Sequence, residues 1–371
     1  MGSQVQTDTM IRLDNVAKVF AGASQPAVAN LSLDVDRGEL VVLLGPSGCG
    51  KTTTLKMINR LIEPTSGRIE VDGRDVMSVP PHELRRSIGY VIQEVGLFPH
   101  RTIAQNMATV PKLLGWDAGR INERVAELTV LVGLDRSMLE RYPTELSGGQ
   151  QQRVGVARAL AADPPVLLMD EPFGAVDPIV RGHLQWEFLE LQSRLGKTVV
   201  FVTHDIDEAI LLGSRIAILN VGGVLEQHDT PERILASPAN EFVESFIGGE
   251  RGLRRLALRP IGEAVVSRGP VIDITGTPDE AVRLMEEHGV SWVGLLSGDQ
   301  LLGWVDASEI DGRPLAALTP REFLVSLRSD SSLRSALDAV VTSHARMAVV
   351  VDDGIYRGMV DLEAIAEEIT E

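Results

Sequence analysis

A glycine-rich stretch, GPSGCGKT at residues 45–52, constrains this chain more than any other segment. It follows the apolar run ELVVLL (39–44) and precedes TTLKMINRL (53–61), in which apolar residues recur at helical spacing. A strand that leads through G-x-x-x-x-G-K-[S/T] into a helix is a phosphate-binding loop, because backbone N–H groups and the helix N-terminus hold phosphate oxygens. We therefore predict a nucleotide site there, lined by Gly45, Pro46, Ser47, Gly48, Cys49, Gly50, Lys51, Thr52 and Thr53.

Within this loop, side-chain chemistry assigns separate roles. Lys51 is expected to reach the β and γ phosphates, and the Thr52 hydroxyl is expected to bind Mg²⁺. Cys49 occupies a variable position of the motif, so we assign it no chemical role and do not interpret it as a nucleophile.

The rest of the first 250 residues predicts an α/β fold. Alternating apolar residues between 11 and 35 indicate antiparallel strands, and GRIEVDGRDV (67–76) indicates a hairpin. The runs VLLMDEP (166–172) and KTVVFVTHD (197–205) are buried strands with polar ends, whereas residues 102–141 are mostly helical in period. Strands that alternate with helices favour a mostly parallel sheet, whose ligands gather beyond the carboxyl ends of the strands.

Polar residues stand at those strand ends. Asp170 is placed to hold Mg²⁺ through water, and Glu171 is placed to polarise an attacking water. Phosphoryl transfer requires both groups. His204 ends the next strand as a further catalytic candidate, and Gln93 ends a shorter one, where its amide could reach metal or water. Taken singly, these residues have ordinary alternatives: a solvated strand end, a structural histidine and a surface-loop glutamine.

A second glycine-backed stretch, LSGGQQQRVGVARAL (146–160), opens another helix. Ser147, Gly148, Gly149 and Gln150 form a potential anion contact, because adjacent glycines let backbone N–H groups approach an anion and the helix end is positive. A simple helix N-cap is the alternative, but it accounts for Ser147 and for neither glycine.

Composition excludes several classes of function. The net charge of −17 argues against a nucleic-acid partner and against polybasic attachment to anionic lipid. With one cysteine among 371 residues, no internal disulfide forms, which fits a reducing compartment. The segment MGSQVQTDTM lacks the apolar core of a signal peptide, and no apolar run approaches the ~20 residues of a membrane span. Any membrane role is therefore expected to be peripheral, through a partner chain.

An internal repeat follows GGERGLRRLALRP (248–260), whose glycine, arginine and proline break the earlier pattern. We place a domain boundary there, giving domains 1–250 and 251–371. GWVD (303–306) recurs as GMVD (358–361), an offset of 358 − 303 = 55 residues. The repeats, about 260–315 and 316–371, are each predicted to run helix, strand, turn, strand, helix and to pack as a pseudo-symmetric pair.

Taken in order, GPSGCGKTT, Gln93, LSGGQ, VLLMDEP, GAVD (174–177) and His204 resemble the motif set of an ABC-transporter ATPase subunit. The resemblance implies that ATP and Mg²⁺ are the cofactors, and that two copies pair head to tail with each ATP between one phosphate loop and the partner's LSGGQ. It also implies that Phe20 stacks on adenine, although a core residue at a strand end is the alternative, and that Asp177 lies at the dimer seam. Many relatives have serine and leucine where this chain has Gly174 and Val176.

Longer stretches, such as KMINRLIEPTSGRIEVDG (56–73) and FGAVDPIVR (173–181), resemble importers of the osmoprotectants glycine betaine, choline, carnitine and proline. This implies a peripheral subunit on the cytoplasmic face of the inner or plasma membrane. It would energise a separate membrane permease that is fed by an extracytoplasmic substrate-binding protein. The Gln93 loop and EVGLFPHRTIAQNM (94–107) would receive the permease's coupling helix. Alternatives are an importer of polar amino acids or polyamines, a non-transport ABC ATPase, and a regulatory binder with an inactive cassette.

In that subfamily a tandem CBS pair follows the ATPase, and the 55-residue repeat is similar to one. Nucleotide-binding CBS pairs usually contact ribose with serine or threonine after G-h-V/I and with aspartate three residues later. This chain has Asp306 and Glu309 in one copy, and Asp361 and Ala364 in the other. Acidic side chains there would repel phosphate, which favours an ionic-strength sensor or an interaction module over a nucleotide sensor.

Overall fold

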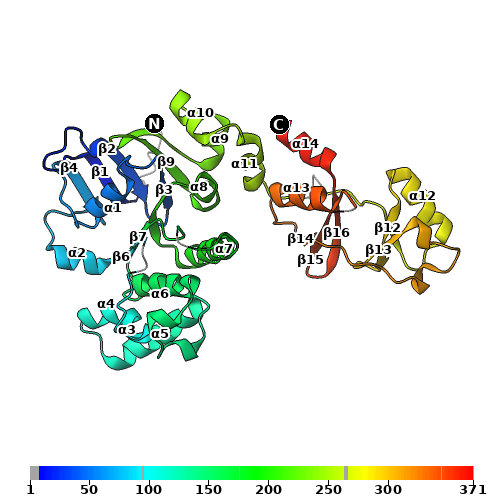
Figure 1. Cartoon of the computed structure of the whole chain (residues 1–371), viewed down its shortest axis with the longest axis horizontal. Coiled ribbons are helices and arrows are strands. Elements are labelled where there is room, and N and C mark those ends of the chain that lie inside the picture. The colour runs from blue at the N-terminus through cyan, green and yellow to red at the C-terminus, as the bar shows by residue number, and fades with distance from the viewer. Residues whose placement is uncertain (1–7, 94–95, 175, 263–265, 344, 371) are drawn as a thin grey trace, which may run out of the picture. The chain divides into compact units, whose positions relative to one another are not determined.

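The computed structural model describes residues 8–370 apart from 94–95, 175, 263–265 and 344 (Figure 1). Contacts divide the chain into two compact units, Met1–Gly248 and Gly249–Glu371. The expectation for the N-terminal segment falls largely on residues 1–7, outside the described part. None of the described helices is long and apolar enough to cross a bilayer.

A four-stranded antiparallel sheet begins the first unit, in the order β2-β1-β4-β5. Its strands are β1 (Thr9–Lys18), β2 (Val28–Asp36), β4 (Ser66–Val71) and β5 (Arg74–Asp75). Ile11 and Leu13 are buried while Arg12 and Asp14 are exposed, which is the alternation expected of a sheet with one covered face. The predicted antiparallel strands and hairpin are confirmed.

The central sheet has six strands in the order β10-β9-β3-β8-β7-β6. They are β3 (Leu40–Leu44), β6 (Ile88–Val91), β7 (Val166–Asp170), β8 (Thr198–Thr203), β9 (Arg215–Asn220) and β10 (Val224–Asp229). All pairings are parallel except that of β10 with β9, so the predicted mostly parallel sheet is confirmed. Every residue of β3, β7 and β8 is buried, which explains their continuous apolar sequences.

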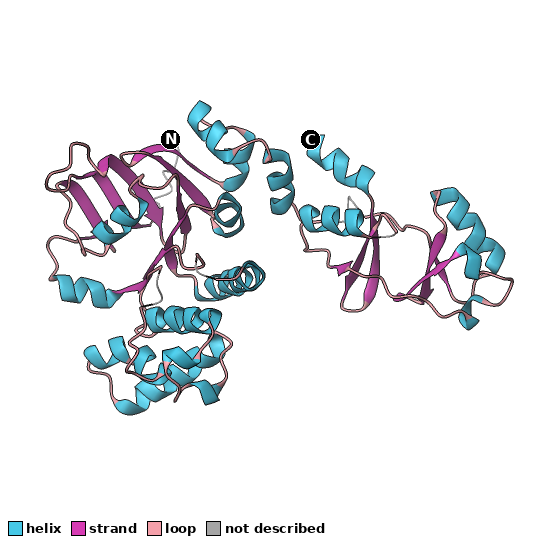
Figure 2. Cartoon of the chain, viewed as in Figure 1, coloured by secondary structure: helices cyan, strands magenta, loops and turns pink. Residues whose placement is uncertain are grey.

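Helices complete the first unit (Figure 2). Near the sheets lie α1 (Lys51–Ile58), α2 (Pro81–Ser87), α7 (Pro178–Leu195), α8 (Ile206–Leu212), α9 (Pro231–Ala236) and α10 (Glu241–Ile247). A separate helical region contains α3 (Ile103–Met107), α4 (Thr109–Leu113), α5 (Ala118–Leu131) and α6 (Gly148–Leu160), which Figure 1 shows grouped on one side of β6 and β7. This region confirms the helical period of residues 102–141 and also contains the helix after LSGGQ.

The second unit is built on one six-stranded sheet, in the order β11-β12-β13-β16-β15-β14. The first copy contributes β11 (Val271–Asp273), α12 (Pro278–His288), β12 (Trp292–Ser297) and β13 (Gln300–Asp306). The second contributes β14 (Ser326–Leu327), α13 (Leu333–Thr342), β15 (Ala348–Asp352), β16 (Ile355–Val360) and α14 (Leu362–Thr370). The strand order reads the same from both edges, and Val271, Trp292 and Leu296 of one copy share a core with Val349 and Met359 of the other.

One local expectation was wrong. The first copy does not end in a helix: only the 3₁₀ turns η3 (Ala307–Glu309) and η4 (Leu315–Ala317) follow β13, because Gly312 adopts φ 85° and Pro314 cannot continue a helix. Within the segment 248–260, where we placed the domain boundary, Arg251–Leu258 forms α11. Leu256 of α11 is buried with Leu333 and Ala336 of α13, so apolar packing outweighs the segment's glycine and arginine content.

Candidate nucleotide-binding site

The phosphate loop joins β3 to α1 with a backbone that only glycine allows. Gly45 has φ 155°, and a Cβ there would lie 2.1 Å from the Leu219 carbonyl oxygen. At Gly50, with φ 98°, a Cβ would lie 2.6 Å from the Ala27 oxygen. The loop is therefore packed against the protein at both ends. Gly48, with φ 79°, has open space around it and is exposed, which leaves its backbone accessible to a ligand.

The start of α1 is suited to an anion. Its N-cap is Gly50, no side chain caps it, and no acidic residue lies in its first turn. Its first N–H groups therefore lack side-chain partners, and the helix dipole adds partial positive charge. Lys51 is buried and its Nζ donates to the carbonyl oxygens of Gly45 at 2.6 Å and Pro46 at 3.0 Å, which holds the ammonium group across the loop.

The other loop residues divide between surface and core. Cys49 is fully buried in the hydrophobic core of the unit, which fits a packing role. Ser47 is exposed, whereas Pro46 and Thr53 are partly buried.

A hydroxyl and a carboxylate meet beside the loop. Thr52 Oγ1 donates to Asp170 Oδ1 at 2.8 Å, across 118 residues of sequence. Burial raises the pKa of Asp170, the neighbouring Glu171 raises it further, and the Thr52 hydrogen bond opposes both. Hard oxygen donors in small number fit Mg²⁺, which usually keeps water and phosphate oxygens as its other ligands. The described residues contain no cluster of three or more His, Cys, Asp or Glu side chains suited to a metal.

Glu171 is contacted by two of the other predicted site residues, His204 and Gln93. Its Oε1 lies 3.2 Å from His204 Nδ1, and its Oε2 accepts a hydrogen bond from Gln93 Nε2 at 3.3 Å. These residues follow β7, β8 and β6, so neighbouring parallel strands bring them to one edge of the sheet. Glu171 has φ 43°, and its N–H donates to the Val202 oxygen at 3.0 Å, which fixes this left-handed conformation. The arrangement provides a carboxylate that is oriented from both sides and suited to accept a proton from water.

The LSGGQ stretch lies at the N-terminus of α6, apart from α1 in Figure 1. Ser147 and Gln150 form a reciprocal capping box, in which Ser147 Oγ accepts from the Gln150 N–H and Gln150 Oε1 accepts from the Ser147 N–H. A Cβ at Gly148 would meet nothing within 4 Å, so packing within the chain does not require this glycine. In the described part of the chain, no hydrogen bond or ion pair joins residues 147–150 to residues 45–53.

Two further predicted residues lie at the surface. Phe20 follows β1 and is 44% exposed, with Lys18 Nζ 5.3 Å from its ring centroid. Asp177 is exposed and directly precedes α7, where its carbonyl oxygen accepts from the Arg181 N–H at 2.8 Å. An exposed ring face suits stacking, and an exposed carboxylate beside the Glu171 turn suits contact with another chain.

Several supporting groups were missed in the sequence. Gln185 Nε2 of α7 donates to Glu208 Oε1 of α8 at 2.9 Å in a buried contact, and burial raises the pKa of Glu208. Tyr90 lies near Asp170, and burial, assisted by that carboxylate, raises the pKa of Tyr90 to about 12. A glutamine or glutamate on a helix has no local signature, and only the tertiary fold reveals these contacts.

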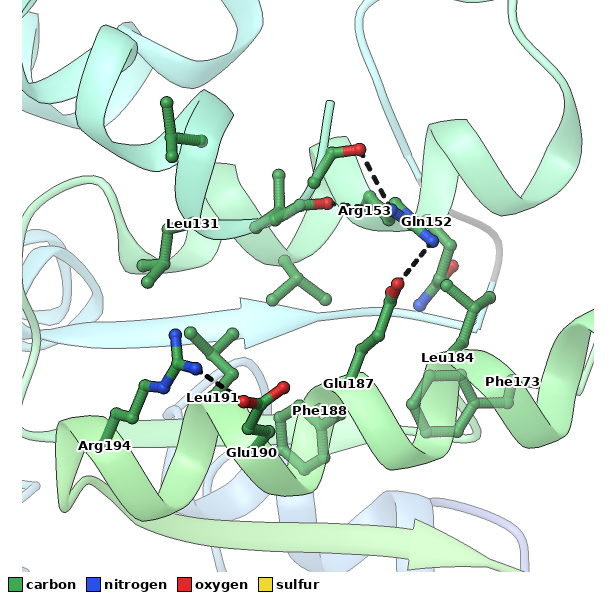
Figure 3. A pocket seen from close by; sticks show the side chains of 14 residues that line it. Leu131, Gln152, Arg153, Phe173, Leu184, Glu187, Phe188, Glu190, Leu191 and Arg194 are labelled. Atoms are coloured by element: carbon green, nitrogen blue, oxygen red, sulfur yellow. Dashed lines mark hydrogen bonds and ion pairs between the residues drawn. The ribbon is translucent and has the colours of Figure 1, made fainter. Parts of the chain in front are cut away.

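A cavity of about 190 Å³ lies between α5, α6 and α7 (Figure 3). Apolar walls come mainly from Leu131, Leu184 and Phe188, and Arg153 Nη2 of α6 pairs with Glu187 Oε1 of α7 at 2.8 Å. Gln152 is 2% exposed, and its Nε2 has no hydrogen-bond partner. The helix that begins with LSGGQ therefore carries a buried polar group that the single chain leaves unsatisfied.

Gln152→Met is expected to raise the free energy of unfolding by about 1 kcal/mol, since a buried amide without a partner costs about 1–3 kcal/mol. Equilibrium denaturation in urea measures the change. Gln151→Met is the matched control, because Gln151 Nε2 donates to the Leu146 oxygen at 3.1 Å and its loss is not expected to stabilise. Equal or opposite effects of the two substitutions would contradict the assignment.

Comparison with known proteins agrees with this geometry. The family profile described as ABC transporter matches residues 28–174. The osmoprotectant import ATP-binding protein OsmV of Salmonella typhimurium is 47% identical over 369 residues, covering 97% of this chain and 96% of that protein. The glycine betaine/carnitine/choline transport ATP-binding protein OpuCA of Bacillus subtilis is 49% identical over 350 residues, covering 93% and 92%. Among solved structures, the dimeric ATP-binding cassette MJ0796 bound to ADP and Pi matches 60% of this chain and 99% of its own, with TM-score 0.54 and 35% identity.

Proposed function

This chain belongs to the ABC-transporter ATP-binding subunits of osmoprotectant importers. We propose on that premise that it hydrolyses ATP to drive uptake of a quaternary ammonium solute such as glycine betaine, choline or carnitine. The observation that carries the proposal is identity of 47% over 97% of the chain, which includes the second unit as well as the cassette. Relatives named for carnitine, choline and glycine betaine transport favour this class over polar amino acids, polyamines or a non-transport role.

Hydrolysis follows from the site geometry. The γ-phosphate lies at the start of α1, where Lys51 and the loop N–H groups neutralise its charge. Glu171 accepts a proton from water as the water oxygen bonds to the γ phosphorus, and the bond from that phosphorus to the bridging oxygen breaks to give ADP and phosphate. His204 and Gln93 orient the Glu171 carboxylate. When bound, Mg²⁺ would lie at Thr52 and Asp170, with the Gln93 amide as the third predicted ligand, and would supply further charge neutralisation of the phosphates.

A second copy of the chain completes each site in this proposal. Among the described residues, no hydrogen bond or ion pair joins LSGGQ to the phosphate loop of the same chain, and a Cβ at Gly148 would meet nothing within 4 Å. A head-to-tail dimer places the LSGGQ of one protomer on the γ-phosphate held by its partner, with Phe20 on the adenine and Asp177 at the seam. The dimeric state of the similar cassette MJ0796, which is described as bound to ADP and Pi, supports this arrangement.

The membrane permease has a suitable docking place beside the Gln93 loop. A cavity of about 230 Å³ is lined by residues of α2, β6, α4 and α6 together with Phe98. Arg158 Nη1 donates to the Gly96 oxygen at 2.6 Å, which ties α6 to the loop that follows Gln93. A helix of the permease seated there would touch both α6 and the Gln93 loop. Docking would thereby be linked to LSGGQ at the start of α6 and to Glu171, which Gln93 contacts. Residues 94–95 of the predicted docking segment lie outside the described residues.

We further assign residues 251–371 to a tandem CBS pair, with repeats at about 260–315 and 316–371, on the basis of the 55-residue offset and the symmetric strand order. Attachment to the permease would hold the chain at the cytoplasmic face of the membrane. An extracytoplasmic substrate-binding protein would deliver the solute to the permease.

Uptake of labelled glycine betaine, choline, proline and one polar amino acid tests the proposed function. Cells carrying the native chain or Glu171→Gln are compared at low and high osmolarity. We expect the variant to lose quaternary-amine uptake while amino-acid uptake is unchanged. Loss of amino-acid uptake alone would move the chain to the alternative importer class, and unchanged uptake of every solute would contradict a role in import.

A further inference from the structure

A cavity of about 370 Å³ in the second unit has an unusual concentration of aromatic residues. It lies where the two copies of the repeat meet, since Ser343 and Ala345 of the second copy line it together with residues of the first. Trp292, Trp304 and Phe323 form its aromatic part, so two of the four tryptophans of the chain are in one pocket. We call this cavity the aromatic pocket.

Backbone pairing holds the rings of the aromatic pocket in place. Trp292 is buried at 5% exposure and meets Phe323 edge to face, with ring centroids 5.8 Å apart. The Trp304 N–H donates to the Arg321 oxygen at 2.9 Å, and the Arg321 N–H donates to the Trp304 oxygen at 2.8 Å. This pairing fixes the Arg321–Phe323 segment against β13, so the pocket is formed before any ligand enters.

One ring of the aromatic pocket already contacts a cation. The Arg321 Cζ lies 5.0 Å from the centroid of Trp304, within the range of a cation–π contact. The same guanidinium pairs with Glu309 Oε1 at 2.8 Å, and its side chain is 55% exposed. Arg321 is therefore free to turn toward another carboxylate without leaving a buried charge unpaired.

The charges of the aromatic pocket favour a cation over an anion. Asp306 and Glu322 line it with Arg321, which gives two carboxylates against one guanidinium. A phosphate in the pocket would meet the negative charges of Asp306 and Glu322. A quaternary ammonium group, in contrast, has no N–H to leave unsatisfied and is attracted to ring faces and carboxylates alike.

We propose that the aromatic pocket binds a zwitterionic quaternary amine, with the trimethylammonium group against Trp292, Trp304 and Phe323 and the carboxylate on Arg321. A cavity of about 370 Å³ is within the size range of small-ligand sites. The choice of glycine betaine as the ligand rests on the proposed function, whereas the pocket chemistry stands without it. The transported solute then also acts on the second unit, which provides a route for the solute to regulate its own uptake.

Titration of the purified full-length chain, by calorimetry and tryptophan fluorescence, tests the proposal. Glycine betaine is expected to bind, whereas glycine, which has the same carboxylate and a primary ammonium group, is expected to bind at least about tenfold more weakly because it loses more hydration on entering. Trp304→Leu is expected to weaken betaine binding about tenfold, and Trp304→Phe to restore most of it, since the ring face is retained. Trp186→Leu, which removes an exposed tryptophan of the first unit, serves as the control and should leave affinity unchanged.

The carboxylate contact has its own test. Arg321→Gln is expected to weaken glycine betaine binding but not tetramethylammonium binding, because tetramethylammonium has no carboxylate and the substitution removes a like charge from the Trp304 ring. Equal affinity for glycine and glycine betaine, no effect of Trp304→Leu, or a response to AMP in place of betaine would each overturn the proposal. If the purified chain binds glycine betaine but Glu171→Gln cells still take it up, the pocket assignment stands and the transport function is refuted. If the chain does not bind glycine betaine but Glu171→Gln abolishes its uptake, the transport function stands and the pocket assignment is refuted.

Discussion

Glu171→Gln is expected to lower ATP turnover by about 10²–10⁴-fold, the usual contribution of a general base, while ATP binding remains intact. The amide is nearly isosteric with the carboxylate, so the phosphate loop, Thr52 and Asp170 should be undisturbed. It cannot accept a proton from water, and it offers one acceptor oxygen where the carboxylate offers separate oxygens to His204 and Gln93. With hydrolysis blocked, the dimer closed around ATP should accumulate.

Steady-state phosphate release and size-exclusion chromatography with and without ATP measure these two effects. Glu190→Gln is the matched control, because this α7 glutamate is exposed and pairs with Arg194 away from the loop. The control should hydrolyse ATP at the native rate and show no stable dimer. Near-native hydrolysis in Glu171→Gln would refute the assignment of Glu171 as the base.

The parts of the site that the sequence predicts are those determined locally. The phosphate loop is contiguous with its strand and its helix, and the conformations of Gly45 and Gly50 are required within that short segment. Gln93, Glu171 and His204 could be placed at one edge of the sheet, because strands in a parallel sheet end together. Their convergence on one carboxylate could not be derived, since it depends on the order β3-β8-β7-β6 and on the left-handed backbone at Glu171.

In the second unit, the sequence repeat predicts the equivalent elements of the two copies, but not the places where the copies differ or meet. An offset of 55 residues predicts the equivalence of α12, which begins at Pro278, with α13, which begins at Leu333, since 333 − 278 = 55. It could not predict the break in symmetry after β13, although Gly312 and Pro314 are the visible cause. The aromatic pocket was missed because Trp292, Trp304 and Phe323 come together only through tertiary pairing.

Lys51→Ala and Gly148→Asp are each expected to abolish ATPase activity in a dimer whose two protomers carry the same single substitution. The first removes the ammonium group from the β and γ phosphates. The second places a carboxylate against the γ-phosphate held by the partner, and a loss of oxyanion-type stabilisation costs about 10²–10³-fold in rate. Gly148→Asp should not disturb the fold, because a Cβ there meets nothing within 4 Å and an acidic residue suits the first turn of a helix.

Mixing the two inactive variants is expected to restore activity to about a quarter of the native value if subunits exchange at random in a two-fold dimer. Half of the dimers would then contain one protomer of each variant. In each of these mixed dimers, one site has both defects, and the other combines an intact phosphate loop with an intact LSGGQ. One site in four is therefore intact. The control mixes native chain with the double variant Lys51→Ala/Gly148→Asp, whose heterodimers carry one defect in each site and should add no activity to that of native dimers. Recovery in the first mixture and not in the second requires that LSGGQ act on the partner's nucleotide, because a site built within one chain would leave both variants inactive in any mixture.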